Sequence, residues 1–136
     1  MSFKFHDWQV YKDARSFRTE INQVVTTYPK EEKYVLIDQS KRAMLSVILQ
    51  IAEGSNRITE KDKIVFINRA LTSLDEVIAC CDCALDDGYI TQQQYKNFYQ
   101  KIENLAKQLR GLENHLKNSI GEPINCARYY YRYCYY

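Results

Sequence analysis

The sequence predicts an all-α fold, an antiparallel up-down four-helix bundle with left-handed packing. Its 136 residues suffice for one domain with a core. Glycine (4) and proline (2) are scarce, and Pro29 and Pro123 bound a proline-free stretch, which favours long helices. Apolar residues recur at alternating steps of three and four, which places them along one side of a helix. An average period of ~3.5 favours helix crossing near +20°.

We expect helices over residues 6–28, 31–54, 60–87 and 91–119, which together form one domain over 1–119, followed by a tyrosine-rich tail over 120–136. The apolar seam of the first helix is Val10, Ala14, Phe17, Ile21, Val24 and Tyr28. That of the third is Ile64, Ile67, Leu71, Leu74, Ile78, Cys81 and Leu85, and that of the fourth is Tyr95, Phe98, Ile102, Leu105, Leu109, Leu112 and Leu116. Gly111, inside the last helix, either allows a close backbone approach or is a neutral surface position.

The second helix differs, because only Ser46 and Gln50 are polar within residues 43–52. A helix that is apolar on nearly all sides must be covered on nearly all sides. Each helix of a small bundle keeps one face in water, so the surplus apolar surface predicts a further partner, most simply another copy of the chain. The alternative is a central helix covered within one subunit.

Residues 51–57 (IAEGSNR) end this second helix. We expect Gly54 to supply a left-handed C-cap. Glu53 is a charge at the end of an apolar run, so we expect it to pair with Arg57 or Arg42, or to cap a neighbouring helix. Within this structural motif, Arg57 is the residue most suited to touch a ligand.

Capping signals place the remaining boundaries. Thr59 with Asp62 opens the third helix as a capping box, with Asp in place of Glu. Asp87 and Gly88 close that helix, and Thr91 with Gln94 opens the fourth. Short connections then make consecutive helices antiparallel neighbours.

The sequence offers no catalytic, cofactor-binding or metal-binding constellation. Cys80 and Cys81 would point about 100° apart on a helix and cannot easily share one ion, so we expect small core residues there. His6 and His115 lack a nucleophile pattern nearby and are expected to be structural. Motifs for phosphate loops and nucleophile elbows are absent, so the sequence predicts that the protein is not an enzyme.

The expected localisation depends on whether the sequence contains a secretory signal or a membrane-spanning segment. The opening MSFKFHDW has no apolar signal region, and the most apolar run is shorter than the ~20 residues that span a bilayer. Five cysteines, an odd number, suit reduced thiols better than a disulfide framework. We therefore expect a cytoplasmic protein without membrane contact.

Charge is distributed unevenly although the net value is only +2. Residues 60–87 carry 3 basic and 7 acidic side chains (3 − 7 = −4), whereas residues 91–119 carry 5 basic and 2 acidic (5 − 2 = +3). Either the two helices attract each other, or the last one presents a basic outer face to an acidic partner. In the tail, six of the last eight residues are Tyr, which suits a flexible segment, an oligomer contact or nucleic-acid stacking.

Five stretches together resemble the four-helix-bundle family encoded within intervening sequences of bacterial 23S rRNA genes. They are residues 5–14 (FHDWQVYKDA), 28–36 (YPKEEKYVL), 51–57 (IAEGSNR), 66–76 (FINRALTSLDE) and 88–90 (GYI). The resemblance spans about residues 5–116 and leaves the tyrosine-rich tail outside. It implies a ring-like homo-oligomer, commonly a barrel-shaped homopentamer. Relatives include the accessory variability determinant of diversity-generating retroelements, which looks like a basic ring that binds nucleic acid and a reverse transcriptase.

Two function hypotheses remain. The first is a non-enzymatic oligomer that binds RNA, such as rRNA, or DNA through a basic surface. Its candidate contact residues are Arg57, Lys96, Lys107, Arg110, Lys117, Arg128 and Arg132. Lys96, Arg110 and Lys117 are spaced by multiples of seven, which places them on one outer face of the last helix. The second is a protein-interaction scaffold or accessory subunit, for example of a reverse transcriptase, in which the acidic end of the third helix (Asp82, Asp86, Asp87) meets a basic partner.

Overall fold

The computed structural model describes residues 3–121. Four long helices account for most of that range: α1 (Gln9–Val24), α2 (Leu36–Ser55), α3 (Glu60–Asp86) and α4 (Gln92–Ser119). Three short 3-10 turns accompany them, η1 (Lys4–Asp7), η2 (Val25–Thr27) and η3 (Lys30–Glu32), and no strand occurs in this part of the chain. The all-α prediction is confirmed. The predictions made for the tail, including Arg128 and Arg132, lie outside the described residues.

The first two helices are shorter than the sequence predicts, because residues 25–35 form 3-10 turns around Pro29. The proline, at φ −58° and ψ 150°, is extended and has no N–H to continue a helix. Helix α2 begins only at Leu36, whose backbone N–H donates to Oε2 of Glu32 at 3.2 Å. The predicted boundaries of α3 and α4 agree with the structure to within one residue.

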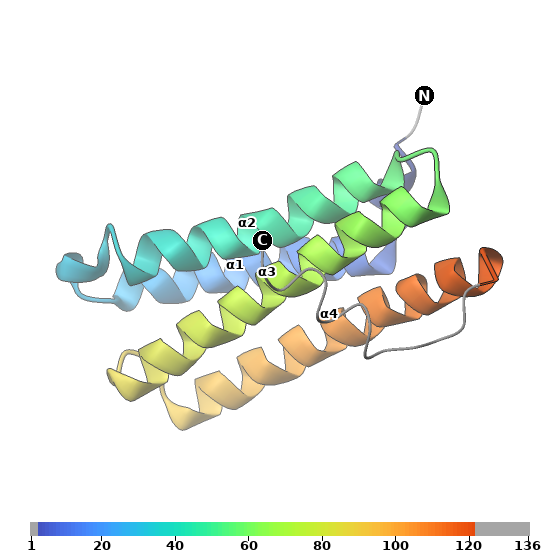
Figure 1. Cartoon of the computed structure of the whole chain (residues 1–136). Coiled ribbons are helices and arrows are strands. Elements are labelled where there is room, and N and C mark those ends of the chain that lie inside the picture. The colour runs from blue at the N-terminus through green and yellow to red at the C-terminus, as the bar shows by residue number, and fades with distance from the viewer. Residues whose placement is uncertain (1–2, 122–136) are drawn as a thin grey trace.

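The helices pack side by side, with α2 and α4 on either side of α3 (Figure 1). Between α2 and α3, Gln39 donates to Glu76 at 3.1 Å and the hydroxyls of Ser46 and Ser73 lie 2.9 Å apart. Gln39 precedes Ser46 along α2, whereas its partner Glu76 follows Ser73 along α3. The paired residues therefore occur in opposite order along the two helices.

Helix α1 completes the bundle by contacting both α2 and α4. Its Asp13 accepts a hydrogen bond from Gln108 at 2.9 Å, and its Glu20 forms an ion pair with Lys101. The rings of Phe17 on α1 and Phe98 on α4 also pack together, with centroids 5.8 Å apart. The basic α4 is thus joined to α1 by this ion pair as well as facing the acidic α3.

The core contains the predicted seams. Every seam position of the first helix is buried, including Tyr28, which lies beyond the end of α1. In α3 the seam is only half-buried at Leu71, Ile78 and Leu85, whereas a flanking row is fully buried. This row is Phe66, Ala70, Ser73, Val77, Cys80 and Ala84. Because α3 packs against two neighbours, it buries a wider face than a single stripe.

Most of the apolar run of α2 is covered within the chain. Its buried members are Ala43, Met44, Val47, Ile48 and Ile51. Leu45 and Leu49, one helical turn apart, remain 40% and 47% exposed. The surplus apolar surface predicted for this helix is therefore a short outward-facing stripe.

The caps predicted at the starts of α3 and α4 and at the end of α3 are present. Thr91 accepts from the N–H of Gln94 at 3.1 Å, while the Gln94 side chain accepts from the N–H of Thr91 at 2.8 Å, which completes the capping box. Thr59 accepts from the N–H of Asp62 at 3.1 Å, which is one of the two bonds of the capping box predicted there. Gly88, at φ +75°, closes α3 with the left-handed residue of a Schellman turn.

No helix within residues 3–121 is both long enough and apolar enough to cross a bilayer.

Candidate nucleic-acid interface

The candidate site is built around Gly54, whose predicted role as a left-handed C-cap is wrong. Gly54 lies inside α2, which continues to Ser55, and its φ is not positive. A Cβ at this position would lie only 2.8 Å from Cβ of Phe66 on α3. The glycine is therefore a close-packing residue that lets the Phe66 side chain stand directly against α2.

Two arginines form cation–π contacts with the ring of Phe66. The guanidinium carbon of Arg57 lies 4.4 Å from the centroid of the Phe66 ring, and that of Arg69 lies 5.0 Å from it. Arg57 follows α2, with its backbone N–H donating to the carbonyl of Gly54 at 3.3 Å, and Arg69 stands one turn after Phe66 on α3. The ring itself is only 7% exposed, whereas both arginines are exposed.

Two like charges are thus held close together at one end of the bundle. Their guanidinium carbons are at most 9.4 Å apart, the sum of the two distances to the shared centroid. Neither arginine has an ion pair with a carboxylate within residues 3–121. The two charges repel each other, and an anion bound between them would relieve that repulsion.

Glu53 does not form the ion pair predicted for it. Arg42 pairs instead with Asp38, with Nε and Oδ2 3.0 Å apart, and Arg57 stacks on Phe66. Glu53 is exposed, because it lies on the side of α2 away from the core. The carboxylate therefore leaves the positive charge of Arg57 available.

The basic residues predicted on α4 are separated from this arginine pair. Lys96 is exposed near the start of α4, at the opposite end of the bundle from Arg57 (Figure 1). Lys107 pairs with Glu103 at 3.4 Å, and both side chains are largely in water. Arg110 is exposed and lies close enough to Asp75 to lower the pKa of that carboxyl, although burial has the larger effect and raises it. Lys96, about three helical turns before Lys107 on α4, therefore does not form one continuous patch with Lys107 and Arg110.

Lys117 does not lie on the outer face, where the heptad spacing places it. Its side chain is 5% exposed and forms an ion pair with Glu113 at 2.5 Å, one turn earlier on α4. Both residues lie beside the apolar seam rather than opposite to it. An ammonium group in this position is neutralised and screened from a polyanion in solvent.

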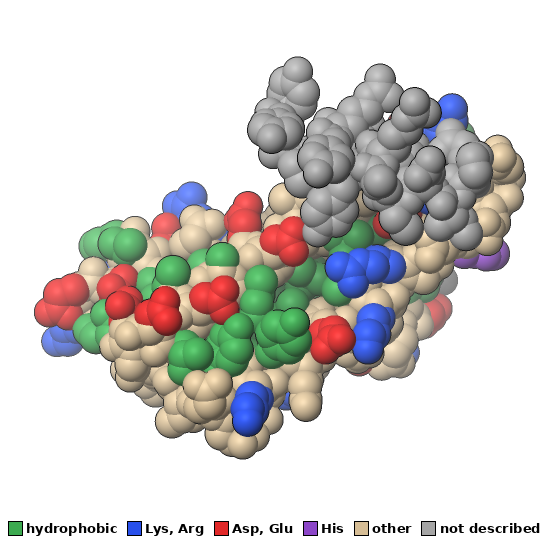
Figure 2. Space-filling model, turned by 60° about the horizontal axis from the view of Figure 1, so that its bottom comes forward, with side chains coloured by type: hydrophobic (Ala, Val, Ile, Leu, Met, Phe, Trp, Pro, Cys, Tyr) green, Lys and Arg blue, Asp and Glu red, His purple; other side chains and the backbone are tan. Residues whose placement is uncertain are grey.

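Two tyrosines donate hydrogen bonds to carboxylates at and near the acidic end of α3. Tyr95 donates to Oδ1 of Asp82 at 2.6 Å, and Tyr89 donates to Oε1 of Glu32 at 3.0 Å. The hydrogen bond to Asp82 is the main cause that raises the pKa of Tyr95 to about 12. Figure 2 shows acidic side chains gathered toward this end of the molecule and apolar ones across the middle of the same face.

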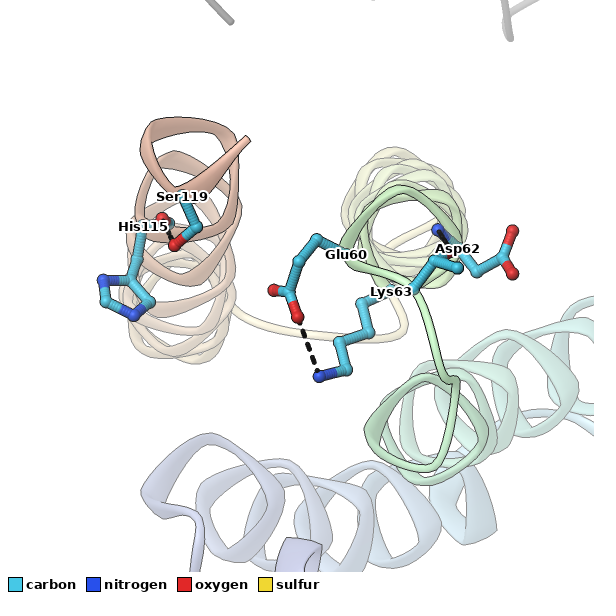
Figure 3. Close-up of polar contacts among 6 residues, drawn as sticks. Glu60, Asp62, Lys63, His115 and Ser119 are labelled. Carbon is cyan, nitrogen blue, oxygen red and sulfur yellow. Dashed lines mark hydrogen bonds and ion pairs between the residues drawn. The ribbon is translucent and has the colours of Figure 1, made fainter. Parts of the chain in front are cut away.

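Near the C-terminal end of α4, Figure 3 shows polar side chains of α3 and α4 in separate local contacts. Lys63 and Glu60 reach toward each other and pair at 3.2 Å, while the imidazole of His115 points away from them. His115 contributes its backbone carbonyl, which accepts from the hydroxyl of Ser119 at 3.0 Å. These groups are arranged as helix-surface contacts.

The cysteines divide into buried and exposed thiols. Cys80 and Cys81 are buried, as the prediction of small core residues requires, and burial raises the pKa of Cys81 to about 12. Cys83 is exposed. Nowhere in residues 3–121 do three or more His, Cys, Asp or Glu side chains come together as a metal site.

Sequence reasoning identified Arg57 but missed Arg69. The missed signal is the spacing of Phe66 and Arg69, three residues apart on a helix, where a cation can reach back over an aromatic ring. That Arg57 joins the same ring depends on the contact between α2 and α3, which no local pattern reveals.

Comparison with known proteins agrees with this architecture. A crystal structure of a protein of unknown function from the S23 ribosomal protein family of Bacteroides thetaiotaomicron superposes with a TM-score of 0.70 at 22% identity, covering 76% of this chain and 97% of that one. At this identity the likeness establishes the fold alone. No curated protein matches the sequence. The model of the family described as 23S rRNA-intervening sequence protein matches residues 6–111. This chain therefore belongs to the 23S rRNA-intervening sequence protein family.

Proposed function

We propose that this protein is a non-enzymatic nucleic-acid-binding protein, acting as a homo-oligomer, and that Arg57 and Arg69 contact phosphates. The observation that carries the proposal is the pair of exposed guanidiniums stacked on one buried ring. Membership in a family named for intervening sequences of 23S rRNA makes RNA the first ligand to test.

The arginine pair suits a phosphate backbone for a physical reason. A guanidinium that lies flat on an aromatic ring keeps its N–H edge free to donate two parallel hydrogen bonds to phosphate oxygens. Holding the side chains on the ring also reduces the entropy lost when the anion binds. Two fixed charges within 9.4 Å match a polymer that carries one charge per ~1.7 Å of duplex axis.

Oligomerisation would multiply this small site. We propose that the antiparallel up-down bundle forms a ring through the exposed Leu45 and Leu49 of α2, and the family resemblance makes a pentamer the expected number. Repeated copies of an arginine pair, together with exposed cations such as Lys96, would sum to a larger field and raise avidity.

Binding is tested by gel shift with structured 23S rRNA fragments at about 50 and about 200 mM salt. Wild type should bind at the lower salt and release steeply at the higher, and Arg57→Gln/Arg69→Gln should bind at least tenfold more weakly. Arg42→Gln is the control, because it removes a single arginine charge from a residue that is already paired with Asp38, whereas the double variant removes two charges that have no carboxylate partner within the described residues. Absence of wild-type binding at low salt would sink the proposal.

The assembly is tested separately by light-scattering mass. Leu45→Lys and Leu49→Lys place charges in the proposed contact and should lower the mass toward that of the 16.1 kDa chain. A monomeric wild type, or variants with unchanged mass, would contradict a contact through this stripe.

A protein-interaction scaffold is the second candidate, favoured by the acidic end of α3. Asp86 and Asp87 are exposed there, and at the α1–α2 connection Tyr34 and Val35 are 82% and 64% exposed. A basic partner with an apolar contact would fit this composition. This reading requires a stoichiometric protein that stays bound after nuclease treatment and is lost on Asp86→Asn/Asp87→Asn.

A further inference from the structure

A second cluster of rings lies at the N-terminal end of α1. The centroid of Phe5 lies 4.8 Å from that of His6, 4.9 Å from that of Tyr11 and 5.8 Å from that of Phe3. The first two pairs are edge-to-face, with interplanar angles of 69° and 68°. We call these four residues the N-terminal aromatic cluster.

The cluster is a surface feature and not part of the core. Phe3 is 63% exposed, His6 is exposed, and Phe5 and Tyr11 are half-buried. Tyr11 also packs against the core and so anchors the cluster to the bundle. Phe3 and His6 extend the cluster into solvent, and exposed rings of this kind suit an interaction surface. The exposed surface of Phe3 offers contact area for another flat group.

Cations accompany these rings. The guanidinium carbon of Arg15 lies 5.7 Å from the Tyr11 ring centroid. Residues 3–18 carry four basic side chains (Lys4, Lys12, Arg15, Arg18) against two acidic ones (Asp7, Asp13), so 4 − 2 = +2. Exposed rings interleaved with positive charge form the kind of surface on which unpaired bases stack while their phosphates are neutralised.

The position of the cluster connects it with the arginine pair. Segment η1, which carries Phe5 and His6, contacts α2, and the N-terminal segment lies at the same end of the bundle as the loop between α2 and α3 (Figure 1). Phosphate contacts at Arg57 and Arg69 and stacking rings at the N-terminus therefore belong to one end of the molecule.

We propose that unpaired nucleobases stack on the N-terminal aromatic cluster, so that the preferred ligand is single-stranded nucleic acid or an unpaired loop. The inference rests on the nucleic-acid binding proposed above and adds the ligand class. A paired duplex keeps its bases stacked inside and cannot present their faces to Phe3 or Phe5. Selectivity for single strands thus comes from the rings, and charge-based affinity comes from the arginines.

The experiment compares a labelled oligouridylate of about 15 nucleotides with a duplex of the same length by fluorescence anisotropy. Phe3→Ala/Phe5→Ala should weaken single-strand binding roughly 5- to 100-fold and leave duplex binding within about twofold. Phe3→Leu/Phe5→Leu is the matched control, because it retains apolar side chains without the rings and should be as defective as the alanine variant. Trp8, the single tryptophan of the chain, adjoins the cluster in sequence and should change its fluorescence on single-strand binding.

The outcomes separate the two proposals. Arg57→Gln/Arg69→Gln should weaken both ligands, so equal loss of both in the ring variants would overturn stacking. Full activity of the leucine variant would show an apolar contact in place of stacking and would also overturn it. Unchanged single-strand affinity with a changed light-scattering mass would reassign the cluster to a contact between copies. Wild type that binds neither ligand would defeat the proposed function itself.

Discussion

Replacing Gly54 by alanine tests the packing that places the arginine pair. The added Cβ would lie 2.8 Å from Cβ of Phe66, at least 0.6 Å closer than the 3.4 Å at which ordinary contact begins. Because that atom is attached directly to the α3 backbone, relief requires a shift of one helix against the other. Overpacking of this kind costs about 1–3 kcal/mol.

Alanine also gains helix propensity at this position, since Gly54 lies within α2 and has no positive φ. That gain is ~1 kcal/mol and partly offsets the clash. Gly111→Ala supplies the control, because Gly111 lies within α4 and a Cβ there would meet nothing within 4 Å. Gly111→Ala should stabilise the protein by up to ~1 kcal/mol, and Gly54→Ala should be about 1–3 kcal/mol less stable than this control.

Urea denaturation of the two variants and wild type, at one protein concentration, measures the difference directly. Gly54→Ala should also weaken nucleic-acid binding, because moving Phe66 moves the ring under both arginines. Equal stabilisation by the two substitutions would refute the close approach of α2 and α3 at this residue.

Three further predictions concern caps, pH and thiols. Thr91→Ala removes the capping-box acceptor of α4 and should cost about 1 kcal/mol in urea denaturation, and a loss below ~0.3 kcal/mol would count against the box. The pKa values of Tyr95, Tyr28 and Cys81 are raised to about 12 in the folded protein, from ordinary values of 10.0, 10.0 and 9.0. The unfolded chain therefore loses these protons first, so the stability that they contribute is present below the ordinary pKa values and should be lost as the pH rises toward 12. Tyr95→Phe should flatten part of that alkaline loss in thermal melts, and an identical pH profile would contradict the bond to Asp82. Iodoacetamide should label Cys83 much faster than Cys80 or Cys81 in peptide maps of the folded protein, and uniform labelling would exclude the described burial.

The architecture was readable from the sequence because burial follows helical periodicity. Val10, Phe17 and Ile21 are all buried, as their spacing predicts, and Thr91 caps α4 as its motif predicts. The start of α2 was misplaced by five residues, because residues 30–35 form a 3-10 helix and further turns where the sequence pattern alone would begin the helix. Helix α3 has a broad apolar face, and the packing of neighbouring helices decides which side of that face is more fully buried. The local sequence pattern does not contain this information.

The candidate site was only partly predictable. Gly54 matched the composition of a helix stop, but its role is set by Phe66, twelve residues later on another helix. Lys117 matched an outward heptad position, yet it lies buried with Glu113. The spacing of residues in the sequence determines on which side of its own helix a side chain lies. Whether another helix covers that side depends on the tertiary packing.

The salt dependence of nucleic-acid affinity tests the central claim most directly. The slope of log K against log[salt] should fall in magnitude for Arg57→Gln/Arg69→Gln by at least ~1.4 on single strands or ~1.8 on duplex, which corresponds to two lost phosphate contacts. Arg42→Gln should keep the wild-type slope, because its charge is already paired with Asp38. A slope common to all three proteins would contradict phosphate binding by the arginine pair on Phe66.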